Sequence, residues 1–197
     1  MIQQKLRDAT SILKQLGFGP KQSNELAGYV LLAMLDLKPQ STWQESASPL
    51  RGITPIIEFI ADHYGQRYAP NTRETVRDEA VKYFVEAGLL LRNPDDSQRP
   101  TNSGKTAYQI EPTALEVLRN FGHRGWPKQL ADYLARRVSI RREQHRHREL
   151  SRIPVALPDG STVRLSPGGQ NPLIKAIVEE FCPRFTPGGR VVYIGDT

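Results

Sequence analysis

Cysteine is nearly absent from this 197-residue sequence, and its scarcity excludes several kinds of protein. Cys182 is the single cysteine, so an internal disulfide and a zinc ribbon are both excluded. Long apolar runs are also absent. The first residues form a charged amphipathic pattern without the apolar core of a signal peptide, and no stretch approaches the length of a membrane span. We therefore expect a reduced, cytoplasmic protein with no membrane partner.

Most of the chain has no excess of positive or negative charge, and the positive excess is concentrated in one segment. Hydrophobic residues make up 38% and charged residues 24% of the sequence, which is typical of a globular protein. The net charge is +6. Residues 124–152 hold nine of the 27 basic and three of the 21 acidic residues, so the rest is balanced at 18 of each. A basic segment in an otherwise neutral chain indicates a polyanionic partner.

Apolar periodicity predicts a mainly α protein with small β elements, an α+β fold. Helices are expected at 2–16, 20–36, 53–64, 72–87, 112–121, 127–150 and 171–185, and hairpins at 89–111 and 153–165. Asn171 is expected to cap the last helix, with Pro172 at its first position. A strand is expected from Arg190. Residues 1–150 are predicted to form a helical domain, and residues 151–197 the hairpin, helix and strand of an incomplete α/β core.

The stretch "NTRETVRDEAVKYFVEAGLL" at 71–90 is predicted to be a helix with two different faces. The apolar stripe consists of Val76, Ala80, Phe84 and Ala87, and Gly88 fits the C′ position. The other face carries Thr72, Arg73, Arg77 and Lys82, whose side chains suit phosphates and guanine edges. Taken alone, this face also fits an ordinary solvated helix.

The order of elements around this stretch favours DNA contact. A helix at 53–64, the helix at 72–87 and a hairpin follow one another as in a winged helix-turn-helix, whose second helix enters the major groove. The hairpin would be the wing. Its expected contact residues are Arg99, Asn102, Ser103 and Lys105. Such units also serve as protein interaction modules, so this alternative stays open.

The run "LARRVSIRREQHRHREL" predicts a helix that contacts the DNA backbone. The expected phosphate-neutralising residues are Arg137, Arg141, Arg142 and Arg148. Glu143 and Glu149 are too few to pair the whole cluster. His145 and His147 lie two residues apart and point to different helix faces, so we predict no metal site here.

Glu179 and Glu180 are the candidate catalytic residues, together with Asp196 near the expected strand end. Carboxylates near a strand end can hold Mg²⁺, although surface glutamates are common and an ordinary solvated role remains the alternative.

Four segments together resemble the BsuBI/PstI family of type II restriction endonucleases: "ITPIIEFIADHYG", "YAPNTRETVRDEAVKYFVEAGLL", "NPDDSQRPTNSGKTAYQIE" and "LSPGGQNPLIKAIVEEFCPRFTPGGRVVYIGDT". The resemblance covers nearly all of the chain from Ile53. It implies a winged-helix-like DNA-reading part and a PD-(D/E)xK nuclease part that cuts CTGCAG with Mg²⁺. The residues matching the family's "NTRET-R" stretch, where the second helix would sit, are Asn71, Thr72, Arg73, Glu74, Thr75 and Arg77.

The resemblance also sets expectations for the nuclease part. Glu179, Glu180 and the strand ending at Asp196 match the first helix and strand of the nuclease core. The family's Pro-Asp element and Glu-bearing strand come after the GDT stretch, which closes this sequence at Thr197. We therefore expect no cleavage by this chain alone and no tightly bound Mg²⁺.

The expected partner is double-stranded DNA, bound by a homodimer on a palindromic site, with a cognate methyltransferase in the same system. Two alternatives remain: a winged-helix transcriptional regulator without nuclease activity, and an inactive remnant that pairs with an intact subunit.

Overall fold

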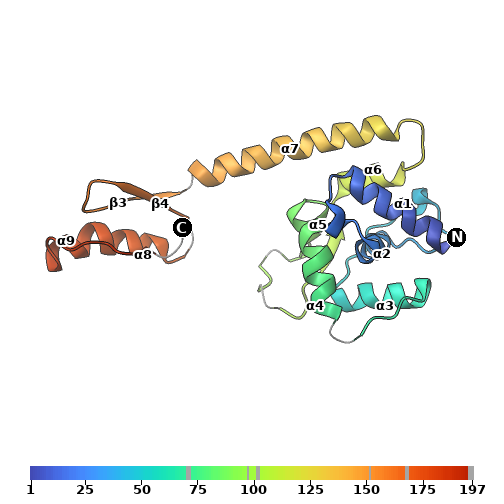
Figure 1. Cartoon of the computed structure of the whole chain (residues 1–197), viewed down its shortest axis with the longest axis horizontal. Helices are drawn as coiled ribbons and strands as arrows, with labels where there is room; N and C mark the ends of the chain where they lie inside the picture. The colour runs from blue at the N-terminus through green and yellow to red at the C-terminus, as the bar shows by residue number, and fades with distance from the viewer. Residues whose placement is uncertain (70–71, 97, 101–102, 151, 167–168, 195–197) are drawn as a thin grey trace. The chain divides into compact units, whose positions relative to one another are not determined.

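The computed structural model describes the chain except residues 70–71, 97, 101–102, 151, 167–168 and 195–197, and for residues 139–150 it describes the backbone only. Two compact units are present, Met1–Arg137 and Val138–Thr197. The fold is mostly helical with small antiparallel sheets, as expected for an α+β protein (Figure 1). The sequence predicted a domain boundary at residue 150 rather than at residue 137, and that domain boundary stays a prediction.

The first unit is helical with one small sheet. Its elements are α1 (Ile2–Gln15), η1 (Pro20–Gln22), α2 (Glu25–Met34), η2 (Trp43–Glu45), α3 (Ile53–Tyr64), α4 (Thr72–Val76), η3 (Arg77–Val81), α5 (Lys82–Glu86), β1 (Leu90–Arg92), β2 (Tyr108–Ile110) and α6 (Pro112–Arg119). Helix α7 (Trp126–Leu150) begins in this unit and continues into the second.

Helix α2 is the centre of the first unit's core, since every residue from Ala27 to Met34 is buried. A helix that is apolar all round is stable only when it is enclosed. Helix α1 packs against it closely, because a Cβ added at Gly28 would lie 2.8 Å from Leu6 Cδ1 and would require that side chain to shift. The helix predicted at 20–36 is interrupted: Asn24 accepts the Ala27 N–H at 2.9 Å and starts α2 afresh.

The helix predicted at 72–87 forms as one continuous helix built of α4, the π-helical turn η3 and α5. The predicted seam is confirmed, because Val76, Ala80 and Phe84 are fully buried. The predicted Gly88 terminus is also confirmed, with φ +71°. The Leu89 and Gly88 amides bond the Phe84 and Val85 carbonyls, which closes a Schellman motif. The wide turn at 77–81 was not predicted.

The hairpin that follows is joined to the start of α3. Strands β1 and β2 are antiparallel, with Leu90 opposite Ile110 and Arg92 opposite Tyr108. On its other edge Tyr108 exchanges two backbone hydrogen bonds with Arg51, at 2.8 and 2.9 Å. Residues 51 to 53 therefore lead straight from this bridge into α3, which fixes the helix start beside the hairpin.

The second unit is a hairpin packed on a short helix. Its elements are β3 (Ile153–Ala156), β4 (Thr162–Leu165), α8 (Asn171–Ala176), the π-helical turn η4 (Ile177–Phe181) and α9 (Cys182–Phe185). The hairpin is antiparallel, with Ile153 opposite Leu165, and Gly160 at its turn has φ +84°. Its buried apolar cluster consists of Val155, Leu165 and Val178.

Two sequence expectations for this unit are wrong. Asn171 is not the cap of α8, because Gln170 precedes the helix and the Asn171 amide donates to Ser166 instead. The strand expected from Arg190 does not form within residues 190–194. A strand requires a hydrogen-bonded neighbour, and in the part of the chain that the structure describes β3 and β4 pair only with each other. Val192 and Tyr193 are largely exposed.

Candidate nucleic-acid interface

A basic groove in the first unit brings the predicted contact residues of the helix and the hairpin together. Its volume is about 500 Å³. Its walls are the start of α3, the polar face of α4–η3, and the hairpin arm. The lining residues are Gly52, Ile53, Thr54, Pro55, Arg73, Arg77, Arg92, Ser103, Gly104, Lys105, Thr106, Ala107 and Tyr108. Four of them are basic and none is acidic, so the groove suits an anionic ligand. We call it the basic groove.

Helix α4 supplies Arg73 to the basic groove, and the π-helical turn η3 that continues it supplies Arg77. Arg73 and Glu74 are exposed, whereas Thr72 and Thr75 are half-buried. Arg73 has no ion pair among the described residues, so its guanidinium remains available to a ligand. Asn71 lies outside the described residues.

Arg77 is held by its sequence neighbour. Its Nε and Nη2 donate to Asp78 Oδ1 and Oδ2 at 2.9 and 3.1 Å. Both side chains are about half exposed, at 51% and 55%. The hydrogen bonds from Arg77 hold the pKa of the Asp78 carboxyl below its usual range, so the carboxylate is charged near neutral pH. The pair leaves the Nη1 edge of Arg77 unoccupied by any described residue.

The hairpin arm is organised by a buried asparagine. Asn93 adopts a left-handed backbone with φ +47°, and its Oδ1 accepts from the Ala107 amide at 3.0 Å and from Arg99 Nη1 at 3.1 Å. Arg99 also donates to Asp95 at 2.6 Å, and its side chain is only 13% exposed. The expected DNA contact of Arg99 therefore competes with a structural role inside the arm.

Of the remaining wing residues, two line the basic groove and one lies outside the described residues. Ser103 and Lys105 line the groove, where Ser103 Oγ accepts the Lys105 amide at 3.2 Å. Asn102 lies outside the described residues. Lys105 is exposed and makes no ion pair in the described part of the chain.

Sequence reasoning missed Arg92 and the start of α3 as parts of this groove. Arg92 ends β1, pairs in register with Tyr108 and faces the groove. Helix α3 begins after Gly52 without a side-chain cap, and its first residues line the groove. A Cβ at Gly52 would lie 3.3 Å from the Thr106 carbonyl oxygen, so the glycine keeps the two walls close. The signal that could have found Arg92 was its place at the end of the first expected hairpin strand, "LLLRN".

Helix α7 does not present Arg137 as expected. The Nη2 of Arg137 donates to the Ala87 carbonyl at the end of α5, and the Arg137 guanidinium lies over the Tyr133 ring, 5.4 Å from the centroid. Arg137 therefore ties α7 to the end of the α4–α5 helix rather than facing outward. The side chains of Arg141, Arg142 and Arg148 lie outside the described part of the structure, although their backbone is helical.

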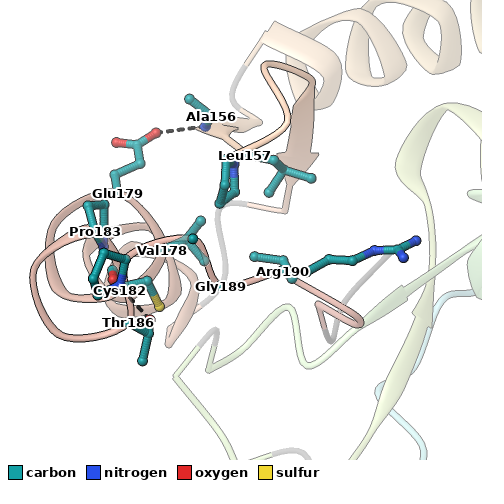
Figure 2. A pocket seen from close by; sticks show the side chains of 13 residues that line it. Ala156, Leu157, Val178, Glu179, Cys182, Pro183, Thr186, Gly189 and Arg190 are labelled. Carbon is teal, nitrogen blue, oxygen red and sulfur yellow. Dashed lines mark hydrogen bonds between the residues drawn. The ribbon is translucent and has the colours of Figure 1, made fainter.

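In the second unit Glu179 is engaged in holding the helix to the hairpin. Figure 2 shows it reaching Ala156, whose amide donates to Glu179 Oε1 at 2.8 Å. Lys175 Nζ donates to the same oxygen at 3.0 Å and to the Pro154 carbonyl at 2.5 Å. The Ala156 amide and, next, Lys175 lower the pKa of Glu179. Glu180 is exposed on the neighbouring position.

The hollow beside Glu179 does not fit a magnesium site. It has a volume of about 870 Å³ and is lined chiefly by apolar and glycine residues such as Leu157, Val178 and Gly189 (Figure 2). Among the residues that the structure describes, no three His, Cys, Asp or Glu side chains gather where a metal ion could bind. Asp196 lies outside them. No reaction step through a metal can therefore be derived from these residues.

Comparison with known proteins identifies the class. Residues 3–142 match the model of the BsuBI/PstI restriction endonuclease HTH domain, and residues 153–197 match the BsuBI/PstI restriction endonuclease domain. Both models describe restriction endonucleases. The chain belongs to the BsuBI/PstI restriction endonuclease family.

Individual relatives agree with this assignment. The chain is 43% identical over 192 residues to the type II restriction enzyme BsuBI of Bacillus subtilis, covering 98% of this chain and 61% of the relative. It is 34% identical over 196 residues to the type II restriction enzyme AplI of Arthrospira platensis, covering 100% and 60%. The solved structure of the SdaI restriction endonuclease is similar with a TM-score of 0.63 and 36% identity, over 96% of this chain and 59% of that one. The chain thus spans about three fifths of the length of each.

No helix in the described part of the chain is long and apolar enough to cross a membrane.

Proposed function

We propose that this chain binds double-stranded DNA as the recognition part of a type II restriction endonuclease. The observation that carries the proposal is the basic groove, in which Arg73 and Arg77 from the helix face Arg92 and Lys105 from the hairpin. Lysine and arginine side chains from separate elements around one groove suit a duplex, whose backbone is anionic and whose base edges accept from arginine.

The first unit would act as a winged helix-turn-helix. Three features support this: α3 precedes the α4–α5 helix by a short connection, a hairpin follows, and the Arg51–Tyr108 bridge joins the hairpin to the start of α3. In that arrangement the polar face of α4–η3 enters the major groove and the hairpin arm follows the backbone. The family's HTH description agrees with this reading.

The finer properties of the function come from the family resemblance. We propose CTGCAG as the recognised sequence, binding as a homodimer on this palindrome, and Mg²⁺-dependent phosphodiester hydrolysis by the full-length enzyme, with a methyltransferase as its functional counterpart. The catalytic carboxylates would lie elsewhere than at Glu179, whose oxygen is occupied by the Ala156 amide and Lys175. A transcriptional regulator is the less favoured reading, because residues 153–197 match a restriction endonuclease domain.

The test is fluorescence anisotropy of the purified chain with a CTGCAG duplex and a scrambled duplex at two salt concentrations. We expect tighter binding to CTGCAG, and a loss of affinity for both duplexes as salt rises, because released counterions accompany each phosphate contact. Equal, steeply salt-dependent binding to both duplexes would refute sequence reading by this chain while leaving backbone binding in place. No binding at low salt would refute the whole proposal.

A further inference from the structure

We propose that Asp78 is a positioning residue for sequence reading: it holds the guanidinium of Arg77 along one edge so that the opposite edge meets a guanine in the major groove. The inference rests on the proposed function, because it assumes that the α4–η3 face approaches DNA. It assigns two different roles within the basic groove: one arginine reads a base, and the other basic residues contact phosphates.

The geometry of the pair fits this role. Arg77 uses Nε and Nη2 to bond both carboxylate oxygens of Asp78, at 2.9 and 3.1 Å, so two parallel hydrogen bonds fix the plane of the guanidinium. Adjacent residues do not normally face each other on an α-helix. Here Arg77 begins the π-helical turn η3. The pair is half exposed, and the two hydrogen bonds to Asp78 set the orientation of the guanidinium.

The free edge of Arg77 has the donors that a guanine requires. A guanine presents O6 and N7 in the major groove, and two parallel N–H donors of an arginine match them. With Nε occupied by Asp78, the Nη1 and Nη2 edge is the one left for this contact. Fixing the guanidinium plane before binding removes part of the ordering cost of the contact.

Electrostatics separates Arg77 from its neighbours in the groove. Arg77 and Asp78 together carry no net charge, so the pair attracts a phosphate weakly and releases few counterions. Arg73 and Lys105 make no ion pair with any described residue, and both line the same groove. They are therefore suited to the backbone. The Asp78 carboxylate would also repel a phosphate, which disfavours binding in registers where Arg77 meets no guanine.

The test compares Asp78→Asn with Glu79→Gln in the whole chain. Glu79 is the next residue, is exposed on the same turn, and loses the same single charge. Anisotropy would measure binding to a CTGCAG duplex, to the same duplex with 7-deazaguanine in place of the site guanines, and to a scrambled duplex. The 7-deaza base lacks the N7 acceptor.

We expect Asp78→Asn to lose about tenfold in the preference for CTGCAG over the scrambled duplex, a fraction of the discrimination that a bidentate guanine contact provides. Its affinity for the scrambled duplex should stay equal or rise. Glu79→Gln should keep the preference. The 7-deazaguanine penalty should be present in the unaltered chain, absent in Arg77→Ala and reduced in Asp78→Asn.

Arg77→Lys provides a second test, because it keeps the charge but cannot form the two-bond pair. It should reproduce the loss seen for Asp78→Asn. Thermal unfolding of each variant checks that the first unit remains folded. If Asp78→Asn and Arg77→Lys keep both the preference and the 7-deazaguanine penalty, the inference is overturned and the proposed function stands. If the unaltered chain shows no preference for CTGCAG, sequence reading by this chain and the role of Asp78 in it are both refuted, while backbone binding stands.

Discussion

At the scale of single residues, arginine has two separate uses in the first unit. Arg51, Arg99 and Arg137 are turned inward: Arg51 contacts Asp36 and the Phe59 ring, and Arg137 contacts the Ala87 carbonyl. Arg73 and Arg77 face the basic groove. The sequence gives each of them the same side chain, and only tertiary packing separates the structural from the ligand-facing members.

Arg137→Ala should lower the free energy of unfolding of the first unit, with a smaller effect on the affinity for DNA. Removing its charged donor leaves the Ala87 carbonyl at the helix end without that bond, so the free energy of unfolding should fall by about 1.5–3 kcal/mol. Urea denaturation measures the change, with Lys128→Ala, an exposed residue of the same helix, as the control. A fully stable Arg137→Ala variant with a smaller salt slope of DNA binding would return Arg137 to the phosphate-contacting group.

At the scale of elements, local signals predicted most of the helices and both hairpins. Helix α3 has the predicted bounds, and Gly88, expected at the C′ position, has the positive φ of such a helix end. Each of these depends on a few neighbouring residues. The strand at 190 failed because strand formation depends on a partner segment, which a local apolar run does not report.

The candidate site was predicted less completely than the elements. Arg73, Arg77, Ser103 and Lys105 were identified from their positions on a helix and a turn. Arg92 joined them through its pairing with Tyr108, and the α3 start through the Arg51–Tyr108 bridge, whose partners lie 57 positions apart in the sequence. Conversely, Arg99 and Glu179 were chosen for their charge, and that charge is used inside the fold.

The hairpin arm depends on Asn93, and we expect Asn93→Ala to loosen it. The substitution removes the acceptor of the Ala107 amide and of Arg99, and alanine is disfavoured at φ +47°. The free energy of unfolding should fall by about 1–3 kcal/mol, and the Ala107 amide should exchange faster with solvent. Asn93→Gly separates the causes, because glycine accepts the backbone but not the hydrogen bonds. Unchanged exchange at Ala107 in both variants would contradict this role.

The contact between η4 and β3 should weaken in acid. Glu179 has a lowered pKa in the folded unit, so its ionised form stabilises the contact above the ordinary glutamate pKa, and that stabilisation is lost as pH falls through the lowered folded pKa. Amide exchange at Ala156, once corrected for intrinsic rates, should therefore accelerate as pH falls below the ordinary glutamate pKa. Glu179→Gln should show fast exchange at neutral pH as well, whereas Glu180→Gln should match the unaltered chain. Identical pH profiles for all three chains would rule the contact out.

At the scale of the whole molecule, the two units differ sharply in the size of their cores. The first unit has a large contiguous apolar core that includes Phe84, Leu31 and Ile60. The second unit buries Val155, Leu165 and Val178, with a few partly buried neighbours. Burial of apolar surface is the main stabilising contribution to folding, so the second unit has much less of it to offset its chain entropy.

We expect the second unit to open more readily than the first. Hydrogen–deuterium exchange followed by mass spectrometry should show fast exchange across residues 153–185 at a temperature where α2 remains protected. Val155→Ala should accelerate exchange in the second unit and leave α2 unchanged, and Val163→Ala is the control on the same hairpin at a less buried position. Equal protection of the two units from exchange would contradict this expectation, because the second unit would then be more stable than its small apolar cluster indicates.

The wide turn at 77–81 carries a consequence for how this scaffold could change over evolutionary time. Such a turn holds one more residue than an α-helical turn, so deleting a single residue there would restore a regular helix. Because the wide turn takes up the extra residue within about one turn of the helix, the segments on either side of it would keep their present directions. Arg73 would stay on the groove side and Phe84 in the core. Only the turn that carries Arg77 and Asp78 would be rebuilt, so a single deletion would change the geometry of this pair while the rest of the helix stayed in place.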